Sequence, residues 1–211
     1  MDKITTTLFD FDGVVANTES QYDIFWTGIE KKYQLGIPDF SARIKGTTIQ
    51  HIFNTYFPHL SRGEQQKIST ACLEFERDMD YEEVPGSVEF LHILKNKGYR
   101  VGLVTSSLVV KMEIALKKMD LETAFDTIVT ADRITRGKPD PMGYLLAAKD
   151  LGTESRKCVV FEDAFTGIQA GTIAGMKVIG LATTNPVAAL EGKVVAVIPD
   201  FRDAEHILAL F

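Results

Sequence analysis

The chain has 211 residues, of which 45% are hydrophobic and 25% charged, and its formal net charge at pH 7 is −6. This composition is that of an ordinary globular protein, long enough for one substantial domain or for a core with a small insertion. The acidic balance argues against a nucleic-acid partner, which requires a basic surface. No run approaches the roughly 18 apolar residues of a membrane span. The two cysteines, Cys72 and Cys158, show no metal-binding spacing, so we expect free thiols, a cytoplasmic protein and no membrane partner.

The first apolar stretch, residues 4–9, reads ITTTLF and predicts a short β-strand because β-branched residues dominate it. Two carboxylates, Asp10 and Asp12, follow this strand directly, and Gly13 comes after them. Taken alone, this pattern has two interpretations. It is either a solvated turn or a pair of reactive carboxylates held at the end of a buried strand.

The region from residue 17 to residue 82 contains no convincing strand. Helical spacing of apolar residues predicts three helices, at 18–33, 48–57 and 61–79. We therefore predict a helical cap at 17–82, inserted after the first strand.

From residue 84 onward, short apolar runs alternate with helix-like segments. The expected strands lie at 100–105, 125–130, 157–161, 177–182 and 194–198, and the expected helices at 87–97, 108–119, 141–151 and 164–175. This alternation is typical of βαβ units with a parallel sheet covered on both faces. The predicted fold is α/β, a doubly wound, Rossmann-like core formed by residues 1–16 and 83–211.

Polar side chains follow several of these strands. In an open parallel sheet, ligands bind beyond the carboxyl ends of the strands. The residues expected there are Asp10, Asp12, Thr105, Ser106, Lys138, Glu162 and Asp163. Carboxylates without histidine or cysteine suit Mg²⁺, while hydroxyls and a lysine suit phosphate. An aspartate can attack phosphorus, and a second acid can exchange protons with the leaving group and with water.

Four stretches resemble, in order, the motifs of the haloacid dehalogenase superfamily. They read DFDGVVANTE, LVTSS, RGKPDP and VVFEDAFTGIQA, and they span residues 10–170. The likeness is greatest to the branch of phosphatases and β-phosphoglucomutases that carry a small helical cap. It implies a Mg²⁺-dependent phosphatase that acts on a small phosphate ester through an aspartyl-phosphate.

The resemblance also implies roles for individual residues. Asp10 is the expected nucleophile and Asp12 the expected general acid and base. The expected phosphoryl ligands are Thr105, the Ser106 amide and Lys138, and the expected Mg²⁺ ligands are Asp10, the Asp12 main-chain carbonyl, Glu162 and Asp163.

Two positions in the cap bear on the choice between hydrolysis and phosphoryl transfer within a sugar. Mutases of this branch carry a histidine where this chain has Tyr22, and an arginine for the distal phosphate where it has Ile49. An isoleucine cannot pair with a phosphate dianion, so hydrolysis is favoured and a hexose-phosphate mutase is the alternative. A catalytically inactive binding protein is a more remote alternative, because such proteins usually lose the nucleophile, the acid or the lysine.

The expected substrate is a sugar, polyol or glycolate phosphate. The candidate cap contacts to it are Tyr22, Lys45, Thr47 and Thr48, although Lys45 is equally compatible with an ordinary surface position. Trp26 fits the cap core better than a sugar-stacking platform. We expect a monomer or a weak homo-oligomer.

Overall fold

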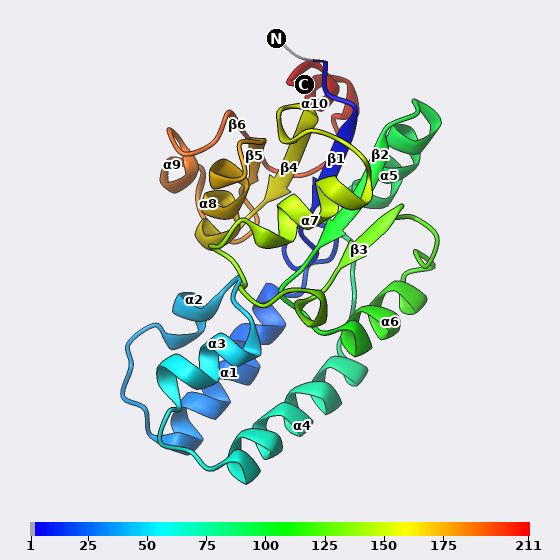
Figure 1. The fold of residues 1–211 in the computed structure, drawn as a ribbon. Coiled ribbons are helices and arrows are strands. Elements are labelled where there is room, and N and C mark those ends of the chain that lie inside the picture. Colours follow the sequence, from blue (N-terminus) through cyan, green and yellow to red (C-terminus); the bar gives the residue numbers. More distant parts are fainter. Residues whose placement is uncertain (1–2) are drawn as a thin grey trace.

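The computed structural model describes residues 3–211, which contain a six-stranded parallel sheet (Figure 1). The strand order is β3-β2-β1-β4-β5-β6. The strands are β1 (Thr6–Phe9), β2 (Arg100–Val104), β3 (Thr127–Val129), β4 (Cys158–Glu162), β5 (Lys177–Leu181) and β6 (Ala196–Ile198). The predicted α/β, Rossmann-like core is confirmed.

Helices cover both faces of the sheet. Because successive side chains in a strand point to opposite faces, Phe9 and Phe161 pack in one apolar cluster and Leu8 and Val160 in another. The first cluster includes side chains of α5 (Ser87–Asn96), α6 (Val109–Lys118) and α10 (Ala204–Ala209). The second includes side chains of α7 (Met142–Asp150), α8 (Phe165–Ile173) and α9 (Val187–Leu190).

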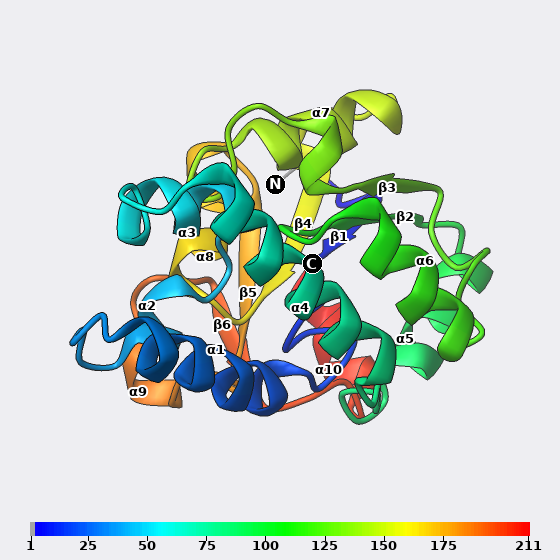
Figure 2. The same cartoon turned by 90° about the horizontal axis from the view of Figure 1, so that it is seen from below.

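Four consecutive helices lie beyond the carboxyl ends of the strands (Figures 1 and 2). They are α1 (Glu19–Tyr33), α2 (Phe40–Ile44), α3 (Ile49–Tyr56) and α4 (Arg62–Asp78). They share an apolar cluster of their own, in which Trp26, Phe40 and Phe57 are buried. This is the helical cap; its domain limits at residues 17 and 82 stay a prediction.

The predicted helices and strands are present, most of them shortened by one to three residues at their ends. Five short elements were not predicted; four of them are α2, α9, and the 3₁₀ turns η1 (Ala131–Arg133) and η2 (Ser155–Lys157). Segments of three to five residues are too short for a helical period to be visible in the sequence. The C-terminal α10, with six residues, was missed for the same reason. Across residues 3–211, no helix combines the length and the apolarity needed to cross a bilayer.

Candidate active site

The predicted site residues converge where the strand order reverses. Strand β1 lies between β2 and β4; β2 and β3 follow on one side of it, and β4, β5 and β6 on the other. Phe9 pairs with Phe161 in the parallel register, so the ends of β1 and β4 are level. This places Asp10 beside Glu162 and Asp163 at the topological switch point, where open α/β sheets bind their ligands.

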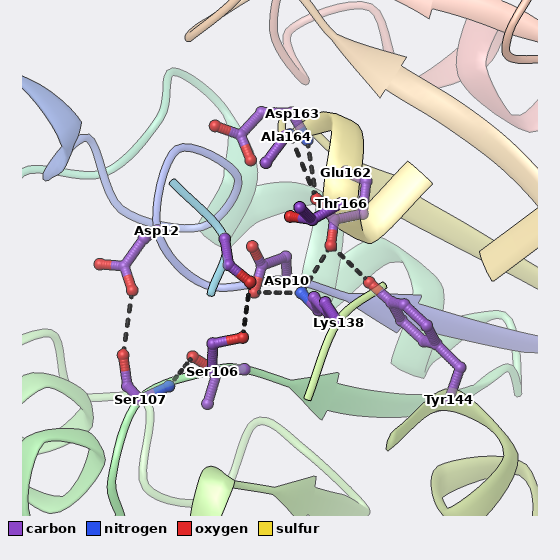
Figure 3. Close-up of polar contacts among 12 residues, drawn as sticks. Asp10, Asp12, Ser106, Ser107, Lys138, Tyr144, Glu162, Asp163, Ala164 and Thr166 are labelled. Carbon is purple, nitrogen blue, oxygen red and sulfur yellow. Dashed lines mark hydrogen bonds and ion pairs between the residues drawn. The ribbon is translucent and has the colours of Figure 1, made fainter. Parts of the chain in front are cut away.

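Lys138 joins the carboxylates of the two strands (Figure 3). Its ammonium lies 2.9 Å from Asp10 Oδ1 and 2.5 Å from Glu162 Oε1, and all three side chains are buried. The hydroxyl of buried Tyr144 donates to the same Glu162 oxygen over 2.7 Å. The other Glu162 oxygen accepts from the backbone N–H of Asp163 at 3.1 Å and of Ala164 at 3.3 Å, just before α8. The loop lysine is thereby fixed between two strand ends.

Burial and the repulsion of neighbouring carboxylates raise the pKa values of two acids here, Asp10 and Asp163. Burial raises the pKa of Asp10 to about 7, against the opposing charge of Lys138. Burial and the neighbouring Glu162 raise the pKa of Asp163 well above its ordinary value. Burial alone lowers the pKa of Lys138, but the charges of Asp10 and Glu162 outweigh it and hold this pKa above its usual range. The cluster therefore has an excess of negative charge that favours a bound cation.

The three acids also have the geometry of a cation site. Carboxylate oxygens of Asp10, Glu162 and Asp163 lie within 4.8 Å of one another. Asp163 Oδ1 is buried and finds no hydrogen-bond partner among residues 3–211, while its Oδ2 accepts from the Thr184 hydroxyl. An unpaired buried carboxylate oxygen is costly, and oxygen donors suit a hard cation such as Mg²⁺. These residues therefore fit the predicted metal.

Gly13 allows the loop after β1 to pass this group. Its φ is +73°, and a Cβ there would lie 2.1 Å from Asp163 Oδ2. Only glycine meets both conditions without strain. The turn that contains Asp10, Asp12 and Gly13 is therefore packed directly against Asp163, which follows β4.

Asp12 turns away from this cluster, toward Ser107 (Figure 3). Its Oδ1 accepts from the Thr18 hydroxyl at 2.5 Å and from Lys111 Nζ at 2.6 Å. Its Oδ2 accepts from Lys111 Nζ at 2.5 Å and from the Ser107 hydroxyl at 3.2 Å. The Asp12 carboxylate thus lies outside the group of carboxylates formed by Asp10, Glu162 and Asp163. This agrees with the expectation that Asp12 would approach a metal only through its main-chain carbonyl.

The loop after β2 carries the expected phosphate ligands. Thr105 is buried, and its hydroxyl accepts from the Ser107 N–H at 3.1 Å. The Ser106 hydroxyl donates to the carbonyl of Gly46 in the cap over 2.8 Å, and the Thr166 hydroxyl donates to the carbonyl of Lys45 over 3.2 Å. Gly46 has φ +71°, and a Cβ there would lie 2.4 Å from the Thr166 hydroxyl. The cap loop therefore docks on the loop after β2 and on the first turn of α8.

A cavity of about 260 Å³ lies between core and cap. Of the predicted cap residues, Tyr22, Lys45 and Thr47 line it, and so does Ile49. The described lining does not include Thr48, whose hydroxyl accepts from the His51 N–H and caps α3. A threonine before an apolar helix is a common N-cap, which explains its position.

The cationic side chain of Lys45 is already paired in this cavity. Its ammonium lies 3.0 Å from Glu19 and 3.1 Å from Asp23, both on α1. Tyr22 donates its hydroxyl to Glu76 on α4 over 2.8 Å. Trp26 is buried in the cap cluster and also lines the cavity.

Four members of the site were not predicted from the sequence: Lys111, Tyr144, Glu76 and Thr184. Lys111 had a usable signal, because it lies on the same helical stripe as Met112 and Ala115, both buried. A lysine on an apolar stripe must find a partner in the interior. For the other three, the site partners Glu162, Asp163 and Tyr22 lie 18, 21 and 54 residues away in the sequence, so no local pattern reveals the contact.

Comparison with known proteins agrees with this geometry. Residues 7–181 match the family model described as haloacid dehalogenase-like hydrolase, so the chain belongs to that family. It is 31% identical over 189 residues to validoxylamine A 7'-phosphate phosphatase of Streptomyces hygroscopicus subsp. limoneus, covering 87% of this chain and 88% of the relative. It is 29% identical over 196 residues to β-phosphoglucomutase of Bacillus subtilis, covering 85% and 84%.

A solved structure of a hydrolase from Pseudomonas syringae superposes with a TM-score of 0.85 at 23% identity, covering 97% of this chain and 98% of that one. This likeness concerns the fold. The family and the named phosphatase among its relatives together confirm the expected enzyme class, a phosphoric monoester hydrolase.

Proposed function

We propose that the protein is a Mg²⁺-dependent phosphatase that hydrolyses a small sugar or polyol monophosphate through an aspartyl-phosphate on Asp10. The observation that supports this most is the buried group of Asp10, Glu162, Asp163 and Lys138 at the switch point of the sheet. A nucleophile, a fixed cationic side chain and a cation site in contact are the parts that phosphoryl transfer requires.

In the proposed reaction, a carboxylate oxygen of Asp10 attacks phosphorus, and the bond from phosphorus to the leaving alkoxide breaks. Asp12 gives its proton to that alkoxide and later takes a proton from the water that hydrolyses the aspartyl-phosphate. Thr105 and the Ser106 amide donate to the phosphoryl oxygens. Lys138, 2.9 Å from Asp10, offsets the repulsion between the anionic ester and the carboxylate.

Mg²⁺ would be held by Asp10, Glu162 and Asp163, with the Asp12 carbonyl as a further ligand. When bound, it supplies positive charge to the phosphoryl oxygens. The protein's own contribution is to keep these acids buried and close together, and the unpaired Asp163 Oδ1 is available for such a contact.

The cavity supports a substrate with one phosphate and an uncharged leaving group. Its two lysines, Lys45 and Lys111, are each paired with carboxylates. Ile49 lines the cavity and offers nothing to a second phosphate dianion. A glycolate phosphate would bring a carboxylate into a cavity already lined by Glu19, Asp23 and Glu76, so a sugar or polyol phosphate is the better candidate.

Hexose-phosphate mutase is the second candidate, favoured by the 29% identity to a β-phosphoglucomutase over most of both chains. A mutase must bind both phosphates of a bisphosphate intermediate. Ile49, which lines the cavity where mutases of this branch carry an arginine, favours hydrolysis instead.

The decisive measurement is phosphate release from a panel of sugar, polyol and glycolate phosphates, with Mg²⁺ and with EDTA. We expect metal-dependent release, fastest from a sugar or polyol monophosphate. The same preparation is then given β-glucose 1-phosphate with a bisphosphate primer. Accumulation of glucose 6-phosphate in place of free phosphate would show a mutase.

A further inference from the structure

Lys111 on α6 is a buried lysine at the boundary between core and cap. Its side chain has 0% exposure, and its ammonium contacts both oxygens of Asp12 and, at 2.9 Å, the hydroxyl of Ser107. The ammonium also lies 4.8 Å from the ring centroid of Tyr22 in the cap and 5.4 Å from that of Phe11. A buried ammonium is stable only while such partners are in place.

The carboxylate of Asp12 is fully engaged by these contacts. Each of its oxygens accepts two hydrogen bonds, one from Lys111 and one from the hydroxyl of Thr18 or Ser107. A carboxylate offers about four lone-pair sites, so Asp12 has none left. To reach a leaving group or a water, Asp12 must therefore give up at least one contact.

The three donors differ in what they can do when Asp12 moves. The hydroxyls of Thr18 and Ser107 rotate and can take another acceptor. Lys111 carries a charge, and among residues 3–211 the carboxylate within ion-pair distance of it is that of Asp12. The cap acid of this network, Glu76, accepts from Tyr22 and from the Cys72 thiol through Oε1 and lies outside ion-pair distance of Lys111. When Asp12 moves, the Lys111 ammonium therefore needs a new acceptor within its reach.

The substrate can supply that acceptor, because Lys111 lines the same cavity as Asp10 and Asp12. We propose that Lys111 is a specificity-determining residue: its ammonium passes from Asp12 to a hydroxyl oxygen of the leaving group and keeps its charge. The freed Asp12 carboxylate can then carry a proton from water to the leaving alkoxide. When the leaving group of an ester has no such oxygen, Asp12 stays paired with Lys111 and proton transfer is slow. This inference rests on the proposed function, in which Asp12 is the general acid and base.

A matched pair of esters tests the exchange. Hexitol 6-phosphate and n-hexyl phosphate are both phosphates of a primary six-carbon alcohol, but only the first carries further hydroxyls. We expect the wild-type enzyme to prefer the hexitol ester in kcat/KM. In Lys111→Met, the ratio of the two kcat/KM values should fall about tenfold or more, the size expected for loss of one hydrogen bond to a charged group. The hexitol ester should lose rate while hexyl phosphate keeps or gains it.

Two further variants separate this role from a structural one. Lys111→Gln keeps an N–H donor without a buried charge, so it should give an intermediate ratio and remains measurable if Lys111→Met does not fold. Lys117→Met makes the same chemical change on an exposed lysine of the same helix and should leave the ratio unchanged.

Each possible result has a defined meaning. A fall in the ratio for Lys111→Met and a smaller fall for Lys111→Gln support the exchange. Equal losses on both esters, or a wild-type enzyme without preference between them, overturn it and leave the phosphatase proposal standing. If the wild-type enzyme with Mg²⁺ releases phosphate from no ester of the panel, the proposed function and this inference both fall.

Discussion

Two buried lysines hold the two aspartates that follow β1, and their surroundings differ. Lys138 lies between Asp10 and Glu162 at the ends of two neighbouring strands, and Tyr144 and backbone N–H groups fix Glu162 in turn. Lys111 contacts the single carboxylate of Asp12, at the edge of the cavity and against a ring of the cap. In the first arrangement Glu162 is held by further contacts of its own, whereas in the second Asp12 must move for the proposed chemistry.

This difference suggests a division of labour: one lysine serves the phosphoryl group that all esters share, and the other responds to the leaving group that differs between esters. Charges shared among fixed groups on a sheet edge can hold a phosphoryl group in the same way for any ester. A charge whose partner changes as the leaving group binds can respond to the identity of that group. The following changes test this division, from the largest expected effect to the smallest.

Asp10→Asn removes the proposed nucleophile and nearly preserves the shape of the side chain. We expect turnover of every ester, including p-nitrophenyl phosphate, to fall by about a thousandfold or more. Phosphate release with Mg²⁺ measures the effect. Full retention of activity would mean that Asp10 does not attack phosphorus.

Lys138→Met leaves Asp10 and Glu162 without their shared cation. We expect kcat/KM to fall roughly a hundredfold for good and poor esters alike, in contrast to the ester-dependent effect expected at Lys111. Removal of one partner from a buried ion pair also costs about 3–5 kcal/mol of stability, which urea unfolding of the metal-free protein can measure. A loss confined to hydroxylated esters would show that the two lysines do not differ in role.

The raised pKa of Asp10 predicts how the stability of the metal-free protein depends on pH. Burial raises this pKa from 3.8 to about 7, so the folded state binds the proton more tightly than the unfolded state. The associated stability is present below about pH 3.8 and is lost as the pH rises to about 7. Thermal unfolding in EDTA should show this decline, and Asp10→Asn should weaken it. A stability that rises through this window in the wild type but not in the variant would contradict the assignment.

Tyr144→Phe makes the smallest change in the cluster around Lys138. It removes one hydrogen bond of 2.7 Å to Glu162 while Lys138 and two backbone N–H groups remain. We expect a loss of roughly 1.5 kcal/mol in unfolding free energy, with the preference among esters unchanged. Tyr33→Phe, on a tyrosine whose ring packs on Phe57 in the cap, is the matched control and should have little effect on activity. A shift in ester preference for Tyr144→Phe would show that the surroundings of Lys138 also influence the choice of leaving group.

Much of this architecture was predictable from local patterns. Apolar runs followed by turn residues located the six strands, because a buried parallel strand is apolar along its whole length. The order of strands and helices then predicted which polar residues meet at one edge, since parallel strands share a carboxyl end. Asp10, Lys138 and Asp163 could be assigned to one site for that reason.

The tertiary structure decided how the charges are paired. Nothing near Asp12 in the sequence indicates that its partner is Lys111, 99 residues away, or that Tyr144 fixes Glu162. The cap contacts of Gly46 with Ser106 and of Lys45 with Thr166 likewise join segments that are distant in the chain. Backbone periodicity is a local property that a sequence carries in each segment, whereas the partner of a buried charge depends on which segments the fold brings within about 3 Å.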